Sequence, residues 1–254
     1  MIRRKSAKEI ELMRRVGRIA AEARRLAGQL VKPGAATNQI DKRVREFIVA
    51  QGGVPAFLNY RGYPATVCVS VNEEVIHGIP SVRKLNDGDI VSIDVGVIKD
   101  GYVGDCAATF IAGRAAPESD RLIEVTRACF YEGLKFAKVG YRVSDISRAI
   151  QTHAEANGYS VVRDYVGHGV GAAIHEPPEV PNYVERPRKR ADPRLVSGMT
   201  LAVEPMVNAG TYAVKVLDDG WTVVTTDGKP SAHYENTILI TAGEPEILTM
   251  CEVP

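Results

Sequence analysis

The chain has 254 residues, of which 45% are hydrophobic and 25% charged, and its formal net charge is +1. This length suits one large α/β unit or two small ones, and the near-zero charge argues against a general nucleic-acid binder, because such proteins carry a strong basic excess. No apolar run approaches the ~20 residues that a membrane span needs. The four cysteines form no C-x-x-C pair, which favours reduced thiols in a cytoplasmic protein over a disulfide framework or a zinc ribbon.

The N-terminal part of the chain predicts two helices followed by strands. In the first helix, residues 6–34, Ser6 and Glu9 have the spacing of a capping box, and Pro33-Gly34 ends an apolar stripe. A second helix is expected over residues 37–53, with Thr37 or Asn38 as its cap. Strand-like segments follow at 66–72, 89–98 and 102–113.

The C-terminal part repeats this order with an offset of 106 residues, which pairs Gly34 with Gly140 and Gly52 with Gly158. Helices are expected at 119–140 and at 144–159, the latter capped by Ser144, and strands at 199–207, 221–226 and 235–241. Two unrelated helical hairpins would give a similar pattern. The duplication predicts an α+β fold, with two halves around a pseudo-twofold axis and a curved, mostly antiparallel sheet covered by helices. We expect one domain over residues 1–254, with halves of roughly 1–115 and 116–254, and a site in the cleft between them.

Two aspartates lie in DIVSIDVGVIKDGYVGDCAATFI, a segment typical of a β-hairpin. A two-residue loop at Lys99-Asp100 would place Asp94 directly opposite Asp105, with Cβ atoms ~4.5–5.5 Å apart. A loop at Asp100-Gly101 would make them diagonal neighbours on one face, and a three-residue loop would separate them. Facing buried aspartates need a cation or a shared proton. The plain alternative leaves one in a turn and one in solvent.

Two glutamates and a histidine extend this set. Glu204 in MTLAVEPMV and Glu235 in AHYENTILI each interrupt an apolar strand, and glycines flank His168 in YVGHGVGAAIHEPPEVPNY. Taken singly, such residues are more often edge, core or loop positions. Together, two Asp, two Glu and a neutral His carry a charge of −4, which two divalent cations would neutralise. Carboxylates with one imidazole suit Mn²⁺, Fe²⁺, Co²⁺ or Zn²⁺, and a dinuclear centre indicates hydrolysis.

These segments resemble the type I methionine aminopeptidases, which are M24 metallopeptidases. The likeness includes NYRGYP and NEEVIHGIP and runs over essentially the whole chain. It implies the pita-bread fold and two metal ions (Co, Mn, Fe or Zn). It also implies removal of the initiator methionine from nascent proteins when the second residue is small, with a hydroxide held between the metals attacking the peptide carbonyl.

The resemblance also implies roles for particular residues. Asp105 and Glu235 would bridge the two metals, and Glu204 would also be the proton acceptor and shuttle. His77 and His175 would touch the substrate and support the tetrahedral intermediate. The implied metal ligands are Asp94, Asp105, His168, Glu204 and Glu235.

An apolar pocket for the methionine side chain is expected as well. The resemblance implies that it is lined by Phe57, Tyr60, Tyr63, Cys68, Ile174 and Trp221, for which ordinary core packing is the alternative. The chain has Phe57 where some relatives carry cysteine, Ile174 where an aromatic residue is common, and Gly96 where threonine is common. These departures affect the expected pocket shape and metal affinity.

Two other functions compete with this one. A proline-specific relative, an aminopeptidase P or prolidase, would have the same fold but usually a large additional N-terminal domain. A non-catalytic binding protein of the same fold would typically lose metal ligands.

The loop VERPRKRADPRL, residues 184–195, carries five basic residues. It is either a solvated surface loop or a contact with ribosomal RNA near the exit of the nascent polypeptide. The chain is otherwise expected to be a monomer without membrane contact.

Overall fold

The computed structural model describes residues 2–184 and 191–250 and contains four helices and fifteen strands in that part of the chain. The helices are α1 (Ala7–Leu30), α2 (Thr37–Ala50), α3 (Pro117–Leu134) and α4 (Val143–Ala156), and Tyr60–Gly62 form a short 3₁₀ turn. The strands of the first half are β1 (Val54–Pro55), β2 (Val67–Val71), β3 (Glu74–Ile76), β4 (Ile90–Lys99) and β5 (Tyr102–Ile111). Those of the second are β6 (Ser160–Val161), β7 (Gly167–Gly169), β8 (Glu176–Val180), β9 (Thr200–Val203), β10 (Met206–Asn208), β11 (Val214–Val216), β12 (Val223–Thr225), β13 (Ser231–His233), β14 (Asn236–Leu239) and β15 (Glu246–Ile247).

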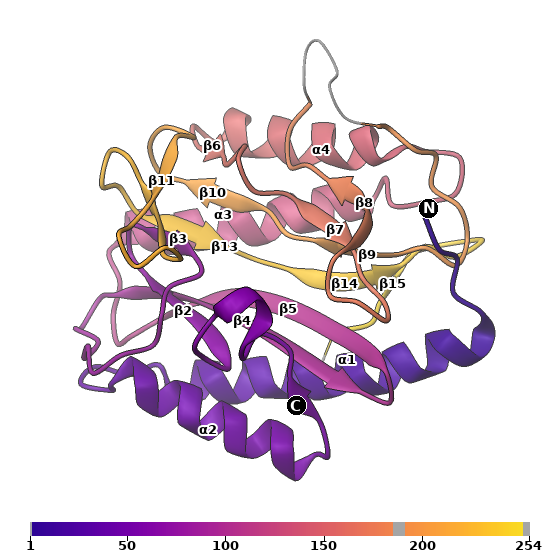
Figure 1. The fold of residues 1–254 in the computed structure, drawn as a ribbon. Coiled ribbons are helices and arrows are strands. Elements are labelled where there is room, and N and C mark those ends of the chain that lie inside the picture. The colour runs from indigo at the N-terminus through magenta and orange to yellow at the C-terminus, as the bar shows by residue number, and fades with distance from the viewer. Residues whose placement is uncertain (1, 185–190, 251–254) are drawn as a thin grey trace.

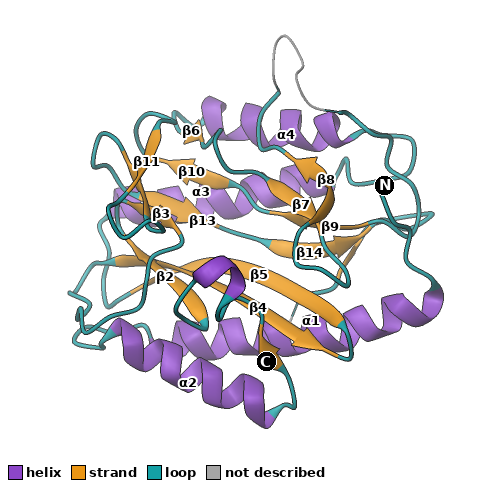
Figure 2. Cartoon of the chain, in the orientation of Figure 1, coloured by secondary structure: helices purple, strands orange, loops and turns teal. Residues whose placement is uncertain are grey.

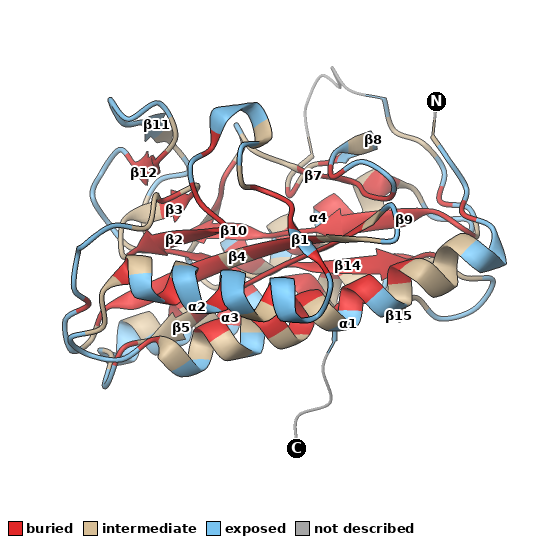
Figure 3. Cartoon of the chain, turned by 60° about the horizontal axis from the view of Figure 1, so that its bottom comes forward, coloured by how far each residue is buried: buried red, intermediate tan, exposed pale blue. Residues whose placement is uncertain are grey.

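The strands of both halves lie between two pairs of helices (Figures 1 and 2). Helices α1 and α2 pack against strands of the first half, and α3 and α4 against strands of the second. The strands are mostly buried, whereas the outer faces of the helices are exposed (Figure 3). The sheet orders are β1-β4-β2 with β5 beside β4, β15-β14-β9-β7-β8, β13-β10-β6 and β11-β12-β3. Every strand pair described is antiparallel, as the sequence predicted.

The offset of 106 residues relates elements of the two halves. Adding 106 to the residue numbers that bound α2 and β1 gives the bounds of α4 and β6. The residues directly before α2 and α4, Ala36 and Arg142, each form an isolated β-bridge with a later segment. This agreement favours the duplicated unit over two unrelated helical hairpins.

The helix caps agree with the sequence only in part. The capping box of Ser6 and Glu9 is present at the start of α1. The expected caps of α2 and α4 are wrong, because Ala36 and Arg142 occupy the cap positions and Thr37 and Ser144 lie inside the first turn. The Thr37 hydroxyl bonds the backbone of Ser81, and the Ser144 hydroxyl donates to Asp192. Distant partners therefore take the hydrogen bonds that a local cap would have made.

The halves join where β5 meets residues 233–237. The backbones of Ala107 and Glu235 exchange both of their hydrogen bonds, at 2.9 and 3.3 Å. This junction lies beside the acidic residues singled out in the sequence. None of the described helices is long and apolar enough to cross a membrane.

Candidate active site and metal centre

A cavity of about 280 Å³ opens between the two halves. Its lining includes every residue that the sequence nominated: Phe57, Tyr60, Tyr63, Cys68, His77, Asp94, Asp105, His168, Ile174, His175, Glu204, Trp221 and Glu235. Residues from both halves therefore meet at one place, as expected for a site in the cleft.

Asp94 and Asp105 reach the cavity from the hairpin of β4 and β5. Gly96 pairs with Asp105 and Asp94 with Ala107, so the two aspartates are diagonal neighbours on one face. The loop consists of Asp100 and Gly101, with φ angles of 51° and 80°, as a type I′ turn requires. Of the three loops considered, the Asp100-Gly101 loop is the one present.

Glu204 and Glu235 lie at matching interruptions of a two-stranded ribbon. Strand β9 stops before Glu204 and continues as β10, while β13 stops before Glu235 and continues as β14. β9 pairs with β14 and β10 with β13, so the two interruptions face each other. Both glutamates are buried. The break in regular pairing lets the ribbon present two acids to the same cavity.

His168 lies on β7, which is squeezed between β8 and β9. A Cβ atom at Gly167 or Gly169 would overlap carbonyl oxygens of the neighbouring strands, which explains the glycines around this histidine. The His168 Nδ1 atom lies 3.0 Å from the carbonyl oxygen of Gly169. With the proton on Nδ1, the Nε2 lone pair faces the acids, 3.3 Å from Glu204 and 3.8 Å from Asp105.

Burial governs the electrostatics of this cluster. It raises the pKa of Asp94 to about 7, and burial together with the neighbouring acids raises the pKa values of Asp105, Glu204 and Glu235 well above their ordinary values. Burial lowers the pKa of His168 to about 4, so its imidazole is neutral. Four crowded carboxyl groups cannot all ionise without a compensating positive charge.

The donor set fits divalent cations. Potential ligand atoms of Asp105, His168 and Glu235 lie within 4.8 Å of one another. Among the described residues, one carboxylate oxygen each of Asp94, Asp105 and Glu235 is buried without a hydrogen-bond partner. Buried oxygens of this kind are normally satisfied by hydrogen bonds or by a cation. Carboxylates with a neutral imidazole suit first-row divalent metals.

His175 lies next to His168, with ring centroids 4.3 Å apart. Its Nδ1 atom is 2.8 Å from the Tyr60 hydroxyl. Burial, followed by the positive charge of Arg61, lowers the pKa of His175. A neutral imidazole here presents its remaining nitrogen to the cavity.

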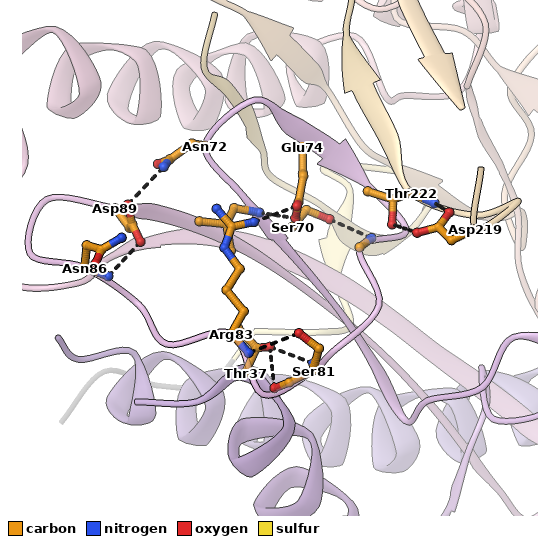
Figure 4. A network of polar contacts seen from close by, with 12 residues as sticks. Thr37, Ser70, Asn72, Glu74, Ser81, Arg83, Asn86, Asp89, Asp219 and Thr222 are labelled. Carbon is orange, nitrogen blue, oxygen red and sulfur yellow. Dashed lines mark hydrogen bonds and ion pairs between the residues drawn. The ribbon is translucent and has the colours of Figure 1, made fainter. Parts of the chain in front are cut away.

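His77 follows β3 in a left-handed backbone conformation, with φ of 60°. The next residue, Gly78, fixes this strained position because it accepts hydrogen bonds from Val69 N and Tyr63 Oη and donates one to Ser70 Oγ, all between 2.9 and 3.0 Å. A polar network around Ser70, Glu74 and Arg83 holds the same segment (Figure 4). The His77 ring packs edge-on against Tyr165 and Trp221.

The remaining wall is apolar. Phe57, Tyr63, Cys68, Ile174 and partly buried Trp221 belong to one hydrophobic cluster. Burial raises the pKa of the Cys68 thiol well above its ordinary value, so this thiol is un-ionised. The cavity thus has a charged, ligand-rich end and an apolar end.

Sequence reasoning missed His233. This buried histidine places Nε2 3.8 Å from Oε2 of Glu204, and burial lowers its pKa to about 3. Strand alternation was the available signal, because positions two residues apart share a face and His233 precedes Glu235 by two. The further lining residues not nominated are Arg61, Ile76, Tyr165 and Val166.

Comparison with known proteins places this geometry in a family. A model of metallopeptidase family M24 matches residues 11–242. The methionine aminopeptidase of Clostridium perfringens is 52% identical over 250 residues, covering 98% of this chain and 99% of that protein. Methionine aminopeptidase 1 of Bacillus subtilis is 50% identical over 249 residues, with the same coverage of 98% and 99%.

The solved structures agree. The methionine aminopeptidase from Rickettsia prowazekii superposes with a TM-score of 0.95 at 41% identity, over 98% of this chain and 100% of that one. The prolidase from Pyrococcus furiosus, at 23% identity and a TM-score of 0.78, shares the fold, and 66% of its length is covered. The expected pita-bread fold is therefore confirmed. The chain belongs to metallopeptidase family M24 and, within it, to the methionine aminopeptidases.

Proposed function

We propose that the cavity between the halves is the active site of a metal-dependent aminopeptidase that removes N-terminal methionine. The observation that carries this proposal is the convergence of four acids, of which Asp105, Glu204 and Glu235 are buried, and a neutral histidine beside an apolar wall. Family membership supports the reaction class. Because the lining comes from both halves, residues 1–254 would act as one catalytic domain.

The proposed metal ligands are Asp94, Asp105, His168, Glu204 and Glu235, and two divalent ions would balance their charge. Asp105 and Glu235 come from opposite halves at the junction, so the ions would be held by ligands from both halves. When bound, such ions supply Lewis-acid polarisation of the scissile carbonyl and lower the pKa of water. The choice among Co, Mn, Fe and Zn depends on metal availability.

Glu204 would move the proton. Its carboxyl is buried and has a raised pKa, so it can accept the proton that the attacking water loses. It would then deliver that proton to the amine nitrogen as the C–N bond breaks. The contact of Glu204 with His168 at 3.3 Å keeps the carboxyl at the charged end of the cavity.

His77 and His175 would act on the substrate rather than on metal. Each has a lowered pKa, so each offers a neutral ring to the peptide carbonyl and its tetrahedral oxyanion. Tyr60 orients His175 through the 2.8 Å contact.

The apolar end would hold the methionine side chain. Phe57, Tyr63, Cys68, Ile174 and Trp221 offer soft, un-ionised surface that suits a thioether, with Tyr60 at the same wall. We expect the enzyme to cleave only substrates in which the residue after the methionine is small.

The substrate is then the N-terminus of a nascent polypeptide, and we infer a cytoplasmic monomer. A contact with ribosomal RNA through residues 184–195 stays a hypothesis, because half of that loop, residues 185–190, lies outside the described residues.

Hydrolysis of Met-Ala-Ser by metal-stripped protein, titrated with Mn²⁺, Fe²⁺, Co²⁺ and Zn²⁺, tests the function. We expect metal-dependent release of methionine from this peptide and little from Met-Leu-Ser. Cleavage of Gly-Pro instead would indicate a proline-specific enzyme. Silence with every metal in folded protein would favour a non-catalytic binding protein.

Two variants in the same assay separate the roles. Glu204→Gln should lower turnover by about 10²–10⁴, the range for a lost general base. His175→Ala should lower turnover by about 10²–10³ while metal stoichiometry stays normal. Loss of metal from His175→Ala would mean that the two neighbouring histidines have been assigned to the wrong roles.

A further inference from the structure

Arg24 of α1 places its guanidinium at the junction of the two halves. Its Nη1 atom donates to the carbonyl oxygens of Glu235 at 2.8 Å and Ala107 at 3.2 Å, and to Asn236 Oδ1 at 3.0 Å. Its Nη2 atom donates to the carbonyl oxygen of Thr249 at 3.2 Å. One partly buried side chain thus joins four chain segments.

Two of these acceptors are the paired residues of the junction itself. Ala107 and Glu235 already exchange backbone hydrogen bonds, and Arg24 donates a further hydrogen bond to each carbonyl oxygen. Ala107 lies two residues after Asp105 on β5, and Glu235 itself carries a cavity carboxylate. The position of the guanidinium therefore bears directly on the spacing of two acids from opposite halves.

The neighbouring pairs of the junction lack this direct backbone exchange. The Thr237 hydroxyl bridges the N–H and carbonyl of Asp105, at 3.2 and 2.9 Å. The Thr109 hydroxyl does the same for His233, at 2.9 and 3.0 Å. Side-chain hydroxyls thus replace main-chain pairing on either side, which leaves the Ala107–Glu235 pair and its arginine as the central fixed point.

We propose that Arg24 is a positioning residue for the metal centre: its guanidinium fixes the separation of Asp105 and Glu235 by bonding both strands at their junction. This inference rests on the proposed function. Groups that orient metal ligands from outside the coordination sphere typically contribute 10–100-fold to affinity. A planar fork with several donors suits this task, whereas a lysine offers a single point charge.

The experiment is calorimetric titration of metal-stripped protein with Mn²⁺, beside thermal unfolding of the same samples. Arg24→Met should weaken Mn²⁺ binding by about 10–100-fold. Arg24→Lys, which keeps the charge but lacks the planar guanidinium, should also bind Mn²⁺ more weakly than wild type. This variant replaces Arg24→Met in the test if the methionine variant does not fold.

Arg14→Met is the matched control. Arg14 lies on the same helix and forms a two-bond ion pair with Glu246 on β15, at 2.7 Å, away from the cavity. This variant should keep wild-type Mn²⁺ affinity. Wild-type affinity in either Arg24 variant would overturn the inference, as would equal weakening in Arg14→Met. Failure of the wild-type protein to bind Mn²⁺ would instead overturn the proposed function, and this inference with it.

Discussion

Phe57, which lines the cavity, packs directly against Gly96. A Cβ atom on Gly96 would lie 2.6 Å from Cε1 of Phe57 and 2.9 Å from Cβ of Ala56. The phenyl ring therefore fills the volume that a side chain at position 96 would need. Two departures from the family pattern, which the sequence presents as unrelated, are complementary in space.

Their coupling is measurable as a double-mutant cycle. Gly96→Thr should destabilise the protein by about 1–3 kcal/mol through overpacking, and Phe57→Cys should destabilise it by leaving a cavity. The double variant should be more stable than the sum of the two, by about 0.5–3 kcal/mol of coupling. Urea unfolding of the four proteins gives the coupling energy. Additive effects would show that the ring moves freely out of the way.

At this scale the sequence predicted the lining well but not its contacts. Each nominated residue lies at the cavity. The resemblance is to a family with a common fold, so matching a motif also predicts where its residues lie in space. His233 escaped notice because its only local signal, a position two residues before Glu235, is shared with ordinary strand residues. Only the position of Glu204, on another strand, makes it a neighbour of the site.

A buried ion pair fixes the loop that carries His175. Lys5 Nζ lies 2.6 Å from Glu176 Oε2, and only 3% of the lysine side chain and 10% of the glutamate side chain are exposed. The other carboxylate oxygen of Glu176 accepts the N–H of Ala173 at 3.2 Å. The segment before α1 thereby holds residues 173–176 at the rim of β8.

Lys5→Met should therefore affect both stability and catalysis. Leaving Glu176 buried and unpaired should cost about 3–5 kcal/mol, and a loosened loop should lower turnover without changing metal stoichiometry. The double variant Lys5→Met/Glu176→Met should recover part of the stability, because no unpaired charge stays buried. Arg14→Met breaks a partly exposed pair and should cost less than about 1 kcal/mol. Chemical denaturation and peptide hydrolysis measure both effects; a Lys5→Met variant no less stable than Arg14→Met would contradict the prediction.

Elements with strong local signals were the predictable ones. The capping box and apolar stripe located α1, and the Asp100-Gly101 turn was among the loops considered. The predicted cap residues of α2 and α4 were wrong, because Thr37 and Ser144 form hydrogen bonds with distant residues instead. The interruptions at Glu204 and Glu235 were visible as acids in apolar strands, but their alignment depends on strand register, which the sequence does not contain.

For the whole molecule, the offset of 106 residues predicted two related halves. Local sequence patterns did not predict the register in which these halves join. This register is set by two threonine hydroxyls and one arginine as well as by backbone pairing. The ionisable groups around the junction are of two kinds, carboxyl groups with raised pKa values and imidazoles with lowered pKa values. The stability of the whole fold should consequently depend on pH through this one region.

The two kinds of group act in opposite directions. Burial raises the pKa of Asp94 to about 7 and that of Glu204 well above its ordinary value, so each carboxyl keeps in the folded state a proton that the unfolded chain releases. Stability is lost as pH rises through the folded pKa. Burial lowers the pKa values of His77 and His168 to about 4. Below their unfolded value of about 6.5, the unfolded chain takes up the protons and stability is lost as pH falls.

Metal-free protein should therefore become more stable as pH falls from about 8 to about 6.5, where only the carboxyls respond, and should gain little below that, where the histidines oppose them. Mn²⁺ at 100 times its Kd should add about 2.7 kcal/mol, or about 5–10 °C in Tm, at pH 8. The gain should shrink toward pH 6.5, because ligand protonation competes with the metal. Thermal unfolding at pH 6.5 and pH 8, with and without Mn²⁺, gives the four Tm values that this prediction compares. A metal-free Tm that rises from pH 6.5 to 8 would mean that the acids are already compensated by charges within the chain, and the case for cations in the cavity would lose its electrostatic basis.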